Sequence, residues 1–356
     1  MKAKNCFIIG PFPPPVHGMS KNLLNFYKDV NENINVTKVD TSPASLNRGL
    51  KYHSKKFVKV INGGIKLFYS QMLRRYEFAY LPPDAGYGAY YSLLFVLVLK
   101  LFKVPVIFHH RSFNYVSKKT LGMTLITKLQ PAGSKHIFLC EKMKREFLNI
   151  YQINCETIII SNAMHVSAQE KFKPTCKPTI KLGHLSNLGV EKGLIEIFKL
   201  CEQLDKHNFN YELLLAGPAE NDEIASVIKS KLSDNSKISY LGYVDPKKKI
   251  EFFNSIDIFL FPTQYRNEAQ PNVLFESFSF GVPALTLDIG CIFGDVDCKR
   301  GVVFKDVEDF RGNAAEVIIK LSQDNKLDLL KESTLISMKD SIEISKKNYS
   351  DFMATL

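Results

Sequence analysis

The sequence predicts an α/β protein made of two doubly wound domains, and three observations support this fold class. Short apolar or β-branched runs alternate with longer amphipathic segments along most of the 356 residues. These runs are continuously apolar, as the strands of a parallel sheet are when helices cover both of its faces. The length suits two domains of about 100–200 residues each, and 45% hydrophobic with 23% charged residues is typical of a globular protein.

The first half alternates in this way without interruption. Apolar runs predict strands at Asn5–Ile9, Val36–Asp40, Phe78–Leu81, Val104–His109, His136–Leu139 and Thr157–Ile160. Amphipathic patterns between them predict helices over Ser20–Val30, Val58–Leu73, Ala89–Phe102, Leu121–Leu129 and Glu141–Ile150. Strands that alternate with helices imply crossover connections, so the sheet is expected to be mostly parallel.

A break in the pattern separates the two halves. Residues 171–178 (KFKPTCKP) contain two prolines and three lysines without any periodicity, which is typical of a linker. We therefore expect a first domain over residues 1–170 and a second over residues 179–330. Residues 331–356 are predicted to form a polar helical tail that could pack back on the first domain.

The alternation restarts after this linker. Strands are predicted at Ile180–Leu185, Tyr211–Ala216, Ile238–Leu241, Ile256–Phe261, Pro283–Leu287 and Gly301–Phe304. Helices are predicted over Leu194–Leu204, Ile224–Leu232, Lys247–Phe253, Val273–Phe278 and Glu308–Leu321. Each half is thus a candidate doubly wound domain, and the crevice between two such domains is the expected ligand site.

Cysteine usage and hydropathy indicate a cytoplasmic chain. The seven cysteines are scattered without a CxxC pair, which favours free thiols over a disulfide framework or a zinc site. The apolar run Cys6–Ile9 is too short for a secretory signal, which needs about 7–15 apolar residues. The most apolar segment, Tyr90–Leu99, is shorter than the ~20 residues of a membrane-spanning helix.

The positive charge narrows the classes of partner. Lysine and arginine number 47 against 36 acidic residues, a formal charge of +11. Nucleic acid, an anionic membrane and phosphorylated substrates all fit such a balance. The basic residues are dispersed, and no zinc, RNP or helix-turn-helix signature appears, so nucleic acid is not expected as a partner.

Two segments of the first half are candidates for ligand binding. The loop Gly10–Ser20 is rich in proline; Gly18 would let backbone approach a ligand, and Ser20 would cap a helix starting near Lys21. A proline-stiffened surface loop is the alternative. The strand ending at His109 is followed by His110 and Arg111, at the sheet edge where α/β proteins bind ligands. The alternative is that one histidine is packed and the other solvated.

The second half offers a basic candidate after its first strand. Residues 182–193 read as strand, loop and helix start, and Lys192 lies where its ammonium and the helix N–H groups could hold a diphosphate. The P-loop pattern GxxxxGK[ST] is absent. A solvent-exposed lysine followed by an ordinary loop glycine is the alternative.

The segment Pro262–Pro283 carries the most informative pattern. Glu268 and Glu276 are eight positions apart, about two helical turns, and would share a face if one helix contained both. Because proline favours the first turn of a helix, Pro271 instead predicts that Glu268 precedes the helix and Glu276 lies inside it. The amides of Asn272, Val273 and Leu274 would then lie between the two carboxylates. Amides suit phosphate and carboxylates suit sugar hydroxyls.

Together these segments resemble glycosyltransferase family 4, the retaining nucleotide-sugar-dependent enzymes with the two-domain GT-B fold. The pattern E-x7-E, met by Glu268 and Glu276 and followed by Gly281-Val-Pro283, is the most specific element. The segment ending in Lys192-Gly193, the proline-rich loop with Gly18, and Ser161-Asn162-Ala163 also match. The resemblance covers nearly the whole chain and implies two Rossmann-like domains that face a central cleft, the first for acceptor and the second for nucleotide sugar.

The resemblance also implies roles for individual residues. Glu276 should bind the nucleotide ribose, Glu268 the hydroxyls of the transferred sugar, and Lys192 the diphosphate. Gly18 should let the first-domain loop approach the diphosphate, and His110 should lie near the donor sugar. Asn187 stands where many members carry a second basic residue for the diphosphate.

The sequence departs from the family at two further positions. His17 replaces the first residue of a common Gly-Gly pair, and Ala269 replaces a common glycine. Catalysis is still expected with these two replacements, but they make the identity of the donor harder to predict.

The expected activity is transfer of a hexose-type sugar, with a UDP-sugar as donor, to a glycan or lipid-linked acceptor in surface polysaccharide or glycoconjugate synthesis. The family needs no metal, no DxD-type metal motif appears, and no cofactor is expected. The alternatives are a non-catalytic subunit with the same fold and a GT-B-like sugar-nucleotide epimerase.

Residues 51–75 could bring such an enzyme to the inner face of the cell membrane. Basic residues there surround an apolar stripe at helical spacing that consists of Phe57, Ile61, Ile65, Phe68 and Met72. The stripe is expected to be buried on the sheet, leaving the lysines free to contact lipid headgroups. An amphipathic segment lying on an anionic membrane is the alternative.

Overall fold

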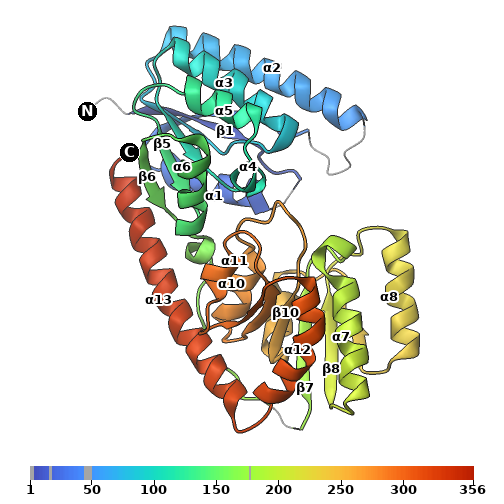
Figure 1. Ribbon diagram of the computed structural model, residues 1–356. Coiled ribbons are helices and arrows are strands. Elements are labelled where there is room, and N and C mark those ends of the chain that lie inside the picture. Colours follow the sequence, from blue (N-terminus) through green and yellow to red (C-terminus); the bar gives the residue numbers. More distant parts are fainter. Residues whose placement is uncertain (1–3, 16–17, 44–49, 176–177) are drawn as a thin grey trace. The chain divides into compact units, whose positions relative to one another are not determined.

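The computed structural model describes residues 4–15, 18–43, 50–175 and 178–356, which divide into two compact units (Figure 1). Unit 1 comprises Met1–Ile160 together with Asn348–Leu356, and unit 2 comprises Ser161–Lys347. The division therefore falls after Ile160, earlier than the boundary at residue 170 that the linker composition suggested. Each unit contains a six-stranded sheet in which all the strand pairs are parallel, which confirms the α/β class.

Unit 1 is built on a sheet of strand order β2-β1-β3-β4-β5-β6. Its strands are β1 (Asn5–Gly10), β2 (Asn35–Asp40), β3 (Phe78–Leu81), β4 (Val106–His109), β5 (Lys135–Phe138) and β6 (Glu156–Ile159). Its helices are α1 (Gly18–Asn31), α2 (Leu50–Leu73), α3 (Ala89–Leu101), α4 (Asn114–Ser117), α5 (Leu121–Leu129) and α6 (Glu141–Tyr151), with a 3₁₀ turn η1 (Gly86–Gly88). Helices α2, α3 and α5 lie side by side (Figure 1).

The tail helix α13 (Lys326–Ala354) begins in unit 2, and its last turns belong to unit 1. Tyr349 donates a hydrogen bond from its hydroxyl to Asp29 Oδ2 at 2.6 Å, and Phe352 stacks on Phe26 of α1. The amide nitrogen of Asn348 donates to the carbonyl of Ile159 at 3.1 Å. These contacts hold the C-terminal end of the chain on helix α1 and edge strand β6 of unit 1.

Unit 2 has the strand order β12-β11-β10-β7-β8-β9, the arrangement of a dinucleotide-binding sheet. Its strands are β7 (Ile180–Leu185), β8 (Tyr211–Ala216), β9 (Ile238–Tyr240), β10 (Ile258–Phe261), β11 (Ala284–Leu287) and β12 (Gly301–Phe304). Besides α13, its helices are α7 (Leu194–Lys206), α8 (Asp222–Asp234), α9 (Pro246–Ser255), α10 (Asn272–Ser279), α11 (Ile292–Val296) and α12 (Val307–Leu321). The 3₁₀ turns are η2 (Asn162–His165) and η3 (Val190–Lys192).

Alternate residues of the unit 2 strands enter two separate cores. Ile258 and Leu260 of β10 pack with α7, α8 and α12, whereas Phe259 and Phe261 pack with α9, α10, α11 and α13. Because successive side chains of a strand point to opposite faces, a strand covered on both sides must be apolar throughout. Strand β10 is accordingly buried at every position.

The strand order places one switch point in each sheet. The direction of winding reverses between β7 and β10 in unit 2 and between β1 and β3 in unit 1. Ligands of open α/β sheets bind outside the carboxyl ends of the strands at such points. The loop after β7 carries Lys192, and the loop after β10 carries Glu268, so both predicted residues belong to the switch point of unit 2.

Each strand predicted from the sequence is present within a few residues of its expected bounds. The short helices α4 and α11 were not predicted, because helices of four and five residues have no measurable periodicity. None of the helices in the described ranges is long and apolar enough to cross a membrane.

The apolar stripe of α2 is not buried on the sheet, and this prediction was wrong. The buried side of α2 is formed by Val60, Gly63, Gly64 and Leu67, whereas Phe57, Ile65, Phe68 and Met72 are exposed. A Cβ on Gly63 would meet Val39 at 2.7 Å and Phe95 at 3.2 Å, so the two glycines allow close helix packing. The glycine side therefore faces the protein, and the larger apolar side faces outward.

Candidate functional site

The loop after β7 presents Lys192 at the start of α7. Turn η3 ends at Lys192, and Gly193 follows with a φ of +83°, in the left-handed region that favours glycine. A Cβ at Gly193 would lie 2.2 Å from the carbonyl oxygen of Pro262, so this glycine also permits close approach to the end of β10. The backbone thus brings Lys192 next to the loop after β10.

Lys192 and Glu268 form an ion pair across this switch point. The ammonium nitrogen lies 2.6 Å from Glu268 Oε2, with the two side chains 26% and 15% exposed. The same nitrogen lies 4.8 Å from the ring centroid of Tyr265, in cation–π geometry. Two residues predicted separately, from loops far apart in sequence, are therefore in direct contact.

The loop that carries Glu268 is fixed by its backbone. The amide of Glu268 donates to the carbonyl of Tyr265 at 2.9 Å, and the amide of Cys291 donates to the carbonyl of Ala269 at 2.8 Å. Gly290 has a φ of +60°, and a Cβ there would lie 2.3 Å from the Glu268 carbonyl oxygen. These contacts set the direction in which the Glu268 side chain leaves the loop.

Helix α10 begins four positions after Glu268, at Asn272, and contains Glu276. The prediction that Glu268 precedes the helix and Glu276 lies within it is confirmed, and a single helix through both is excluded. Glu276 Oε1 accepts a hydrogen bond from Lys249 Nζ of α9 at 2.8 Å. The carboxylate is thereby held in one orientation.

The start of α10 offers fewer amides than expected. The first N–H groups of a helix have no partner inside the helix and can bind an anion. The Leu274 amide is already occupied, because it donates to the carbonyl of Pro271 at 3.2 Å. This leaves the amides of Asn272 and Val273 as the candidate anion donors. The side-chain oxygen Oδ1 of Asn272 is buried and has no hydrogen-bond partner among the described residues.

Asn187, the remaining residue of unit 2 that was predicted to contact the donor, is exposed on the loop after β7.

Sequence reasoning missed Gln270, which connects three parts of unit 2. Its Oε1 accepts from the Asn162 amide at 2.7 Å, its carbonyl accepts from Asn162 Nδ2 at 2.9 Å, and its Nε2 donates to Asp295 Oδ1 at 2.8 Å. Burial raises the pKa of Asp295 to about 7, although Gln270 and Arg300 act in the opposite direction. Nothing in the local sequence distinguishes Gln270, because its partners are more than twenty residues away.

His184 is a second residue that the sequence did not single out. Its Nδ1 lies 2.7 Å from the carbonyl oxygen of Leu260 and its Nε2 lies 2.8 Å from Ser186 Oγ. Burial lowers its pKa to about 4, so the ring is neutral at pH 7. His184 thereby links β7 to β10, close to the ends of these strands where the loops of the switch point begin.

The histidine predicted to approach the sugar is buried in the core of unit 1. His110 has no exposed surface and stacks on Phe138 with ring centroids 4.6 Å apart. Its Nε2 lies 2.8 Å from His136 Nδ1, and its Nδ1 lies 3.2 Å from the Tyr115 hydroxyl. The ring therefore has no exposed surface in this structure, and the expected place of His110 near the donor sugar stays a prediction.

The hydrogen bonds of this buried cluster fix its protonation. His136 Nε2 lies 2.8 Å from Gln130 Oε1, which can only accept, so His136 carries its proton there. His136 Nδ1 then accepts from His110 Nε2, and His110 Nδ1 accepts from Tyr115. Burial, with His136 nearby, lowers the pKa of His110 well below its usual value, and burial lowers that of His136 to about 3. Both rings are neutral, which matches the bonding pattern.

Helix α1 begins at Gly18, directly after the proline-rich loop. Ser20 lies inside the first turn, so the helix starts earlier than predicted and Ser20 is not its N-cap. Its hydroxyl Oγ instead donates to the carbonyl of Pro15 in the proline-rich loop at 2.9 Å. His17, which replaces a common glycine, lies outside the described residues.

Comparisons with known proteins find a family match within unit 2 and a fold shared by the whole chain. Residues 167–332 match the model of the family described as "Glycosyl transferases group 1". A comparison with curated protein sequences finds no match. Solved structures do match over the full length of the chain.

Three of these structures illustrate the likeness. The apo lipopolysaccharide outer core galactosyltransferase WaaB has a TM-score of 0.71 at 14% identity, covering 99% of this chain and 100% of that chain. HepE of Anabaena in complex with UDP and glucose has a TM-score of 0.67 at 12% identity, with the same coverage. Sucrose-phosphate synthase of Thermosynechococcus elongatus has a TM-score of 0.68 at 11% identity, again with 99% and 100% coverage.

At such low identity these structures show the fold, and the family match covers the unit that holds Lys192, Glu268 and Glu276. Residues 167–332 thus carry a glycosyl transferases group 1 domain, and the chain is a glycosyltransferase with the GT-B fold.

Proposed function

We propose that this chain is a retaining glycosyltransferase of family 4 that moves a hexose-type sugar from a nucleotide diphosphate sugar to a hydroxyl of a glycan or lipid-linked acceptor. A UDP-sugar is the expected donor, and surface polysaccharide or glycoconjugate synthesis is the expected setting. The observation that carries the proposal is the contact of Lys192 with Glu268 at the switch point of unit 2, just ahead of the helix that holds Glu276.

The ion pair suggests how donor binding prepares the reaction. Breaking the bond between the anomeric carbon and the diphosphate oxygen places negative charge on the leaving diphosphate and positive charge on the sugar ring. The Lys192 ammonium and the first amides of α10 would stabilise the diphosphate. Once the diphosphate takes the ammonium, the Glu268 carboxylate is released to accept hydrogen bonds from sugar hydroxyls. The proposed chemistry uses these side chains and amides and no metal or other cofactor.

Glu276 would hold the ribose. A carboxylate can accept hydrogen bonds from both ribose hydroxyls, and the bond from Lys249 limits its rotation before the donor arrives. Such preorganisation lowers the entropy that binding costs. The complex of HepE with UDP and glucose supports a nucleotide and a sugar as ligands of this fold, and the name of WaaB supports a lipid-linked acceptor class.

A panel of nucleotide sugars tests the proposal. The chain is mixed with UDP-glucose, UDP-galactose, UDP-N-acetylglucosamine and GDP-mannose, and thermal stabilisation and release of free nucleotide are both measured. We expect one donor to raise the melting temperature and to be hydrolysed slowly, with water taking the place of the acceptor hydroxyl and the α-configuration of the donor retained in the released sugar. Stabilisation without any release of nucleotide would identify a binding subunit, and a new nucleotide sugar without free nucleotide would identify an epimerase.

We further propose that the enzyme works as a peripheral protein on the inner face of the cell membrane, where a lipid-linked acceptor would be available. The apolar outward side of α2 and the basic residues around it support this location.

A further inference from the structure

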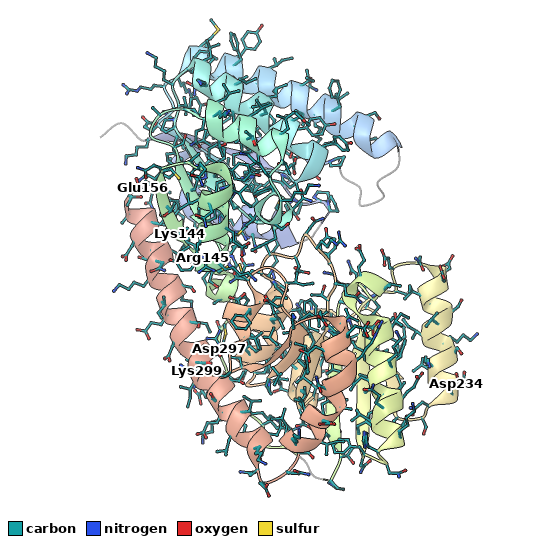
Figure 2. All side chains as sticks on the ribbon, viewed as in Figure 1. Lys144, Arg145, Glu156, Asp234, Asp297 and Lys299 are labelled. Atoms are coloured by element: carbon teal, nitrogen blue, oxygen red, sulfur yellow. The ribbon has the colours of Figure 1, made fainter. Side chains whose placement is uncertain are left out.

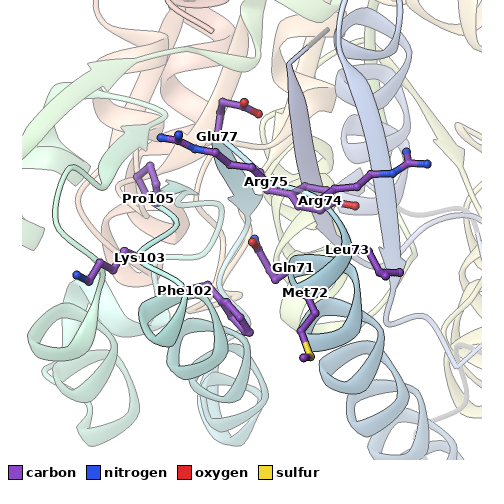
Figure 3. A pocket seen from close by; sticks show the side chains of 10 residues that line it. Gln71, Met72, Leu73, Arg74, Arg75, Glu77, Phe102, Lys103 and Pro105 are labelled. Atoms are coloured by element: carbon purple, nitrogen blue, oxygen red, sulfur yellow. The ribbon is translucent and has the colours of Figure 1, made fainter. Parts of the chain in front are cut away.

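Asp295 is a buried carboxyl group that takes no part in the chemistry proposed above. It lies on the short helix α11 with 8% of its surface exposed, and its Oδ2 has no hydrogen-bond partner among the described residues. Two other buried polar atoms share this lack, but their surroundings differ. Gln71 lines an open pocket of about 780 Å³ at the end of α2 (Figure 3), and Asn272 lies at the proposed donor site. Burying a carboxyl group costs free energy, so the position of Asp295 in the core of unit 2 indicates a specific role.

Asp295 holds one side of the Gln270 amide. Its Oδ1 accepts a hydrogen bond from Gln270 Nε2 at 2.8 Å. On the other side, Gln270 Oε1 accepts from the backbone amide of Asn162 at 2.7 Å and from Ser161 Oγ at 3.2 Å. Because Nε2 can only donate and Oε1 can only accept, these partners allow a single orientation of the amide. The side chain of Gln270 is thus fixed from both sides, and its partner on the Asp295 side carries a charge when ionised.

Gln270 lies two positions after Glu268, in the segment that joins the switch-point loop to α10. The backbone of this segment is also held by hydrogen bonds. The carbonyl of Gln270 accepts from Asn162 Nδ2 at 2.9 Å, and the carbonyl of Ala269 accepts from the Cys291 amide at 2.8 Å. A shift of Gln270 would therefore move the Glu268 carboxylate relative to its ion-pair partner.

Arg300 holds the backbone of Asp295 and ties it to the part of α13 that belongs to unit 2. Its Nη1 donates to the carbonyl of Asp295 at 2.7 Å. Its Nε donates to Ser337 Oγ at 2.9 Å, and its Nη2 donates to the carbonyl of Ser337 at 2.7 Å and to Ser341 Oγ. The guanidinium also lies 5.8 Å from the ring centroid of Phe278 on α10. The backbone of Asp295 is therefore fixed, and its carboxyl group faces Gln270 from a rigid support.

Opposing effects bring the titration of Asp295 close to neutral pH. Burial raises the pKa of Asp295 to about 7, while the hydrogen bond from Gln270 and the charge of Arg300 act to lower it. The charged residues on the segments that pack against α11 are Glu268, Asp297, Lys299, Arg300, Lys339 and Asp340. Of these only Arg300 is buried, and Asp297 and Lys299 lie on the exposed turn after α11 (Figure 2). Solvent screens the exposed charges, so burial, Gln270 and Arg300 set the charge of Asp295.

The two forms of Asp295 hold Gln270 with different strength. An ionised carboxylate accepts a charge-assisted hydrogen bond, which is about twice as strong as a bond between neutral groups. In the neutral form, a proton on Oδ2 has no acceptor within the part of the chain that the structure describes. The segment that carries Glu268 is therefore held more firmly when Asp295 is ionised.

We propose that Asp295 is a positioning residue of the transfer reaction, whose ionised carboxylate holds Gln270 and thereby sets the place of the Glu268 carboxylate beside the donor sugar. The inference rests on the proposed function for the role of Glu268, whereas the hydrogen bonds between Asp295 and Gln270 stand independently of it. Asp295 acts on the sugar end of the donor site. The ribose end is held separately, because Glu276 has its own hydrogen bond from Lys249.

The pH dependence of nucleotide release tests the proposal, with the donor found in the panel. For the unmodified chain we expect kcat to rise about fivefold between about pH 6 and pH 8, as the bond to Gln270 becomes charge-assisted. Asp295→Asn keeps an acceptor for Gln270 but cannot ionise. Its kcat should therefore stay near the low-pH value of the unmodified chain at both pH values, and its KM for the donor should change less than about twofold, because the ribose contacts are untouched.

A neighbouring carboxylate supplies the matched control. Asp297 is exposed and bonds the backbone amide of Lys299 at 2.7 Å, away from Gln270. Asp297→Asn makes the same chemical change two positions further along the chain, and it should keep the full rise of kcat with pH. The same rise in Asp295→Asn, or a loss of the rise in Asp297→Asn as well, would overturn the proposal.

Amide hydrogen exchange separates a failure of this inference from a failure of the proposed reaction, because it needs no donor. At about pH 8, peptides over residues 161–166 and 264–275 should exchange about threefold faster in Asp295→Asn than in the unmodified chain, because local opening follows the strength of the bonds that hold a segment. Peptides over β8 should not change, and neither should any peptide of Asp297→Asn.

The outcomes of the two experiments are distinct. Equal exchange in the three proteins would overturn the inference even if a donor is turned over, and so would faster exchange that extends to β8, which would show a general loss of stability. Faster exchange confined to the two peptides, with no donor turned over, would confirm that Asp295 holds the Glu268 segment and would remove the proposed reaction instead.

Discussion

The carboxyl edges of the two sheets differ in where their polar side chains point. At the edge of unit 2, Lys192 and Glu268 leave separate loops and meet at 2.6 Å while remaining partly exposed. At the edge of unit 1, His110 also follows a strand, β4, which lies one strand away from the switch point, and its side chain turns into the core. The position of a residue at a strand end predicts the edge it belongs to, but it does not predict the direction of its side chain.

The difference has a physical cause in the residues around each loop. In unit 2, Gly193 and Gly290 hold the backbone in left-handed conformations and allow loops to touch, which leaves the charged side chains at the surface. In unit 1, Phe138 and Phe147 provide flat apolar surfaces against which the His110 ring packs. A neutral imidazole with both nitrogens bonded is stable in such a core.

The largest effect is expected for Lys192→Ala. Loss of the ammonium that would stabilise the departing diphosphate should lower the rate of transfer by about 10²–10³, as the loss of one oxyanion-hole donor does. Steady-state release of nucleotide measures it, and Lys229→Ala on the exposed side of α8 serves as the control. A rate within twofold of the unmodified chain would contradict the site.

The contrasting variant in unit 1 is His110→Phe. It removes the partner of both His136 and Tyr115, so we expect a loss of about 1–3 kcal/mol in the free energy of unfolding. The rate of transfer should fall less than tenfold, because the ring has no exposed surface. A rate loss as large as that of Lys192→Ala, at unchanged stability, would show that His110 reaches the substrate.

Stability should rise with pH between about pH 5 and 6. The pKa values of His110, His136 and His184 are lowered by burial, so in this range the unfolded chain binds three protons that the folded chain does not. Asp295, whose pKa is raised to about 7, acts in the opposite direction, since the folded chain keeps its proton. The net of two protons corresponds to about 2.7 kcal/mol per pH unit.

Urea unfolding at several pH values measures this slope. Asp295→Asn removes the opposing group, and the slope should then increase to about 4 kcal/mol per pH unit. A stability that is flat or falls between pH 5 and 6 would show that the histidines are not held neutral.

The variant Gln270→Leu tests whether the Glu268 loop is positioned through buried hydrogen bonds. It leaves the Asn162 amide without its acceptor, which should cost about 1–3 kcal/mol in the free energy of unfolding. Transfer should slow with little change in donor affinity, since the carboxylate moves but is not removed. Gln270→Glu keeps the acceptor and should restore part of the rate; equal behaviour of both variants would argue against a positioning role.

The smallest effect is expected for Glu276→Gln, which weakens the proposed ribose contact. Loss of a hydrogen bond to a charged acceptor costs about 1.5 kcal/mol, so donor affinity should fall about tenfold. Titration calorimetry with the donor found in the panel measures it. Glu251→Gln, an exposed position on α9, is the matched control, and an equal change in the two variants would remove the ribose assignment.

The sequence was sufficient for the fold because strand and helix periodicities are local. The strand runs and the helix starting after Pro271 both follow from neighbouring residues. The sequence predicted Lys192 and Glu268 as two separate candidates but not the contact between them. Their loops come together only because β7 and β10 are neighbours in the folded sheet.

Three features depend on tertiary packing and could not be predicted from local sequence periodicity. Gln270 acts through distant partners, and His110 is buried by aromatic rings from β5 and α6. For α2, hydrophobic periodicity identified the apolar stripe correctly but assigned it to the wrong side. The glycine pair Gly63-Gly64, which packs against Phe95 and Leu94, decides which side faces the protein.

The most direct measurement is a crystal structure of the chain soaked with UDP. We expect the diphosphate beside Lys192 Nζ and the first amides of α10, the ribose hydroxyls on the Glu276 carboxylate, and the ion pair between Lys192 and Glu268 opened. Nucleotide bound elsewhere, with that ion pair intact, would contradict the assignment of the donor site.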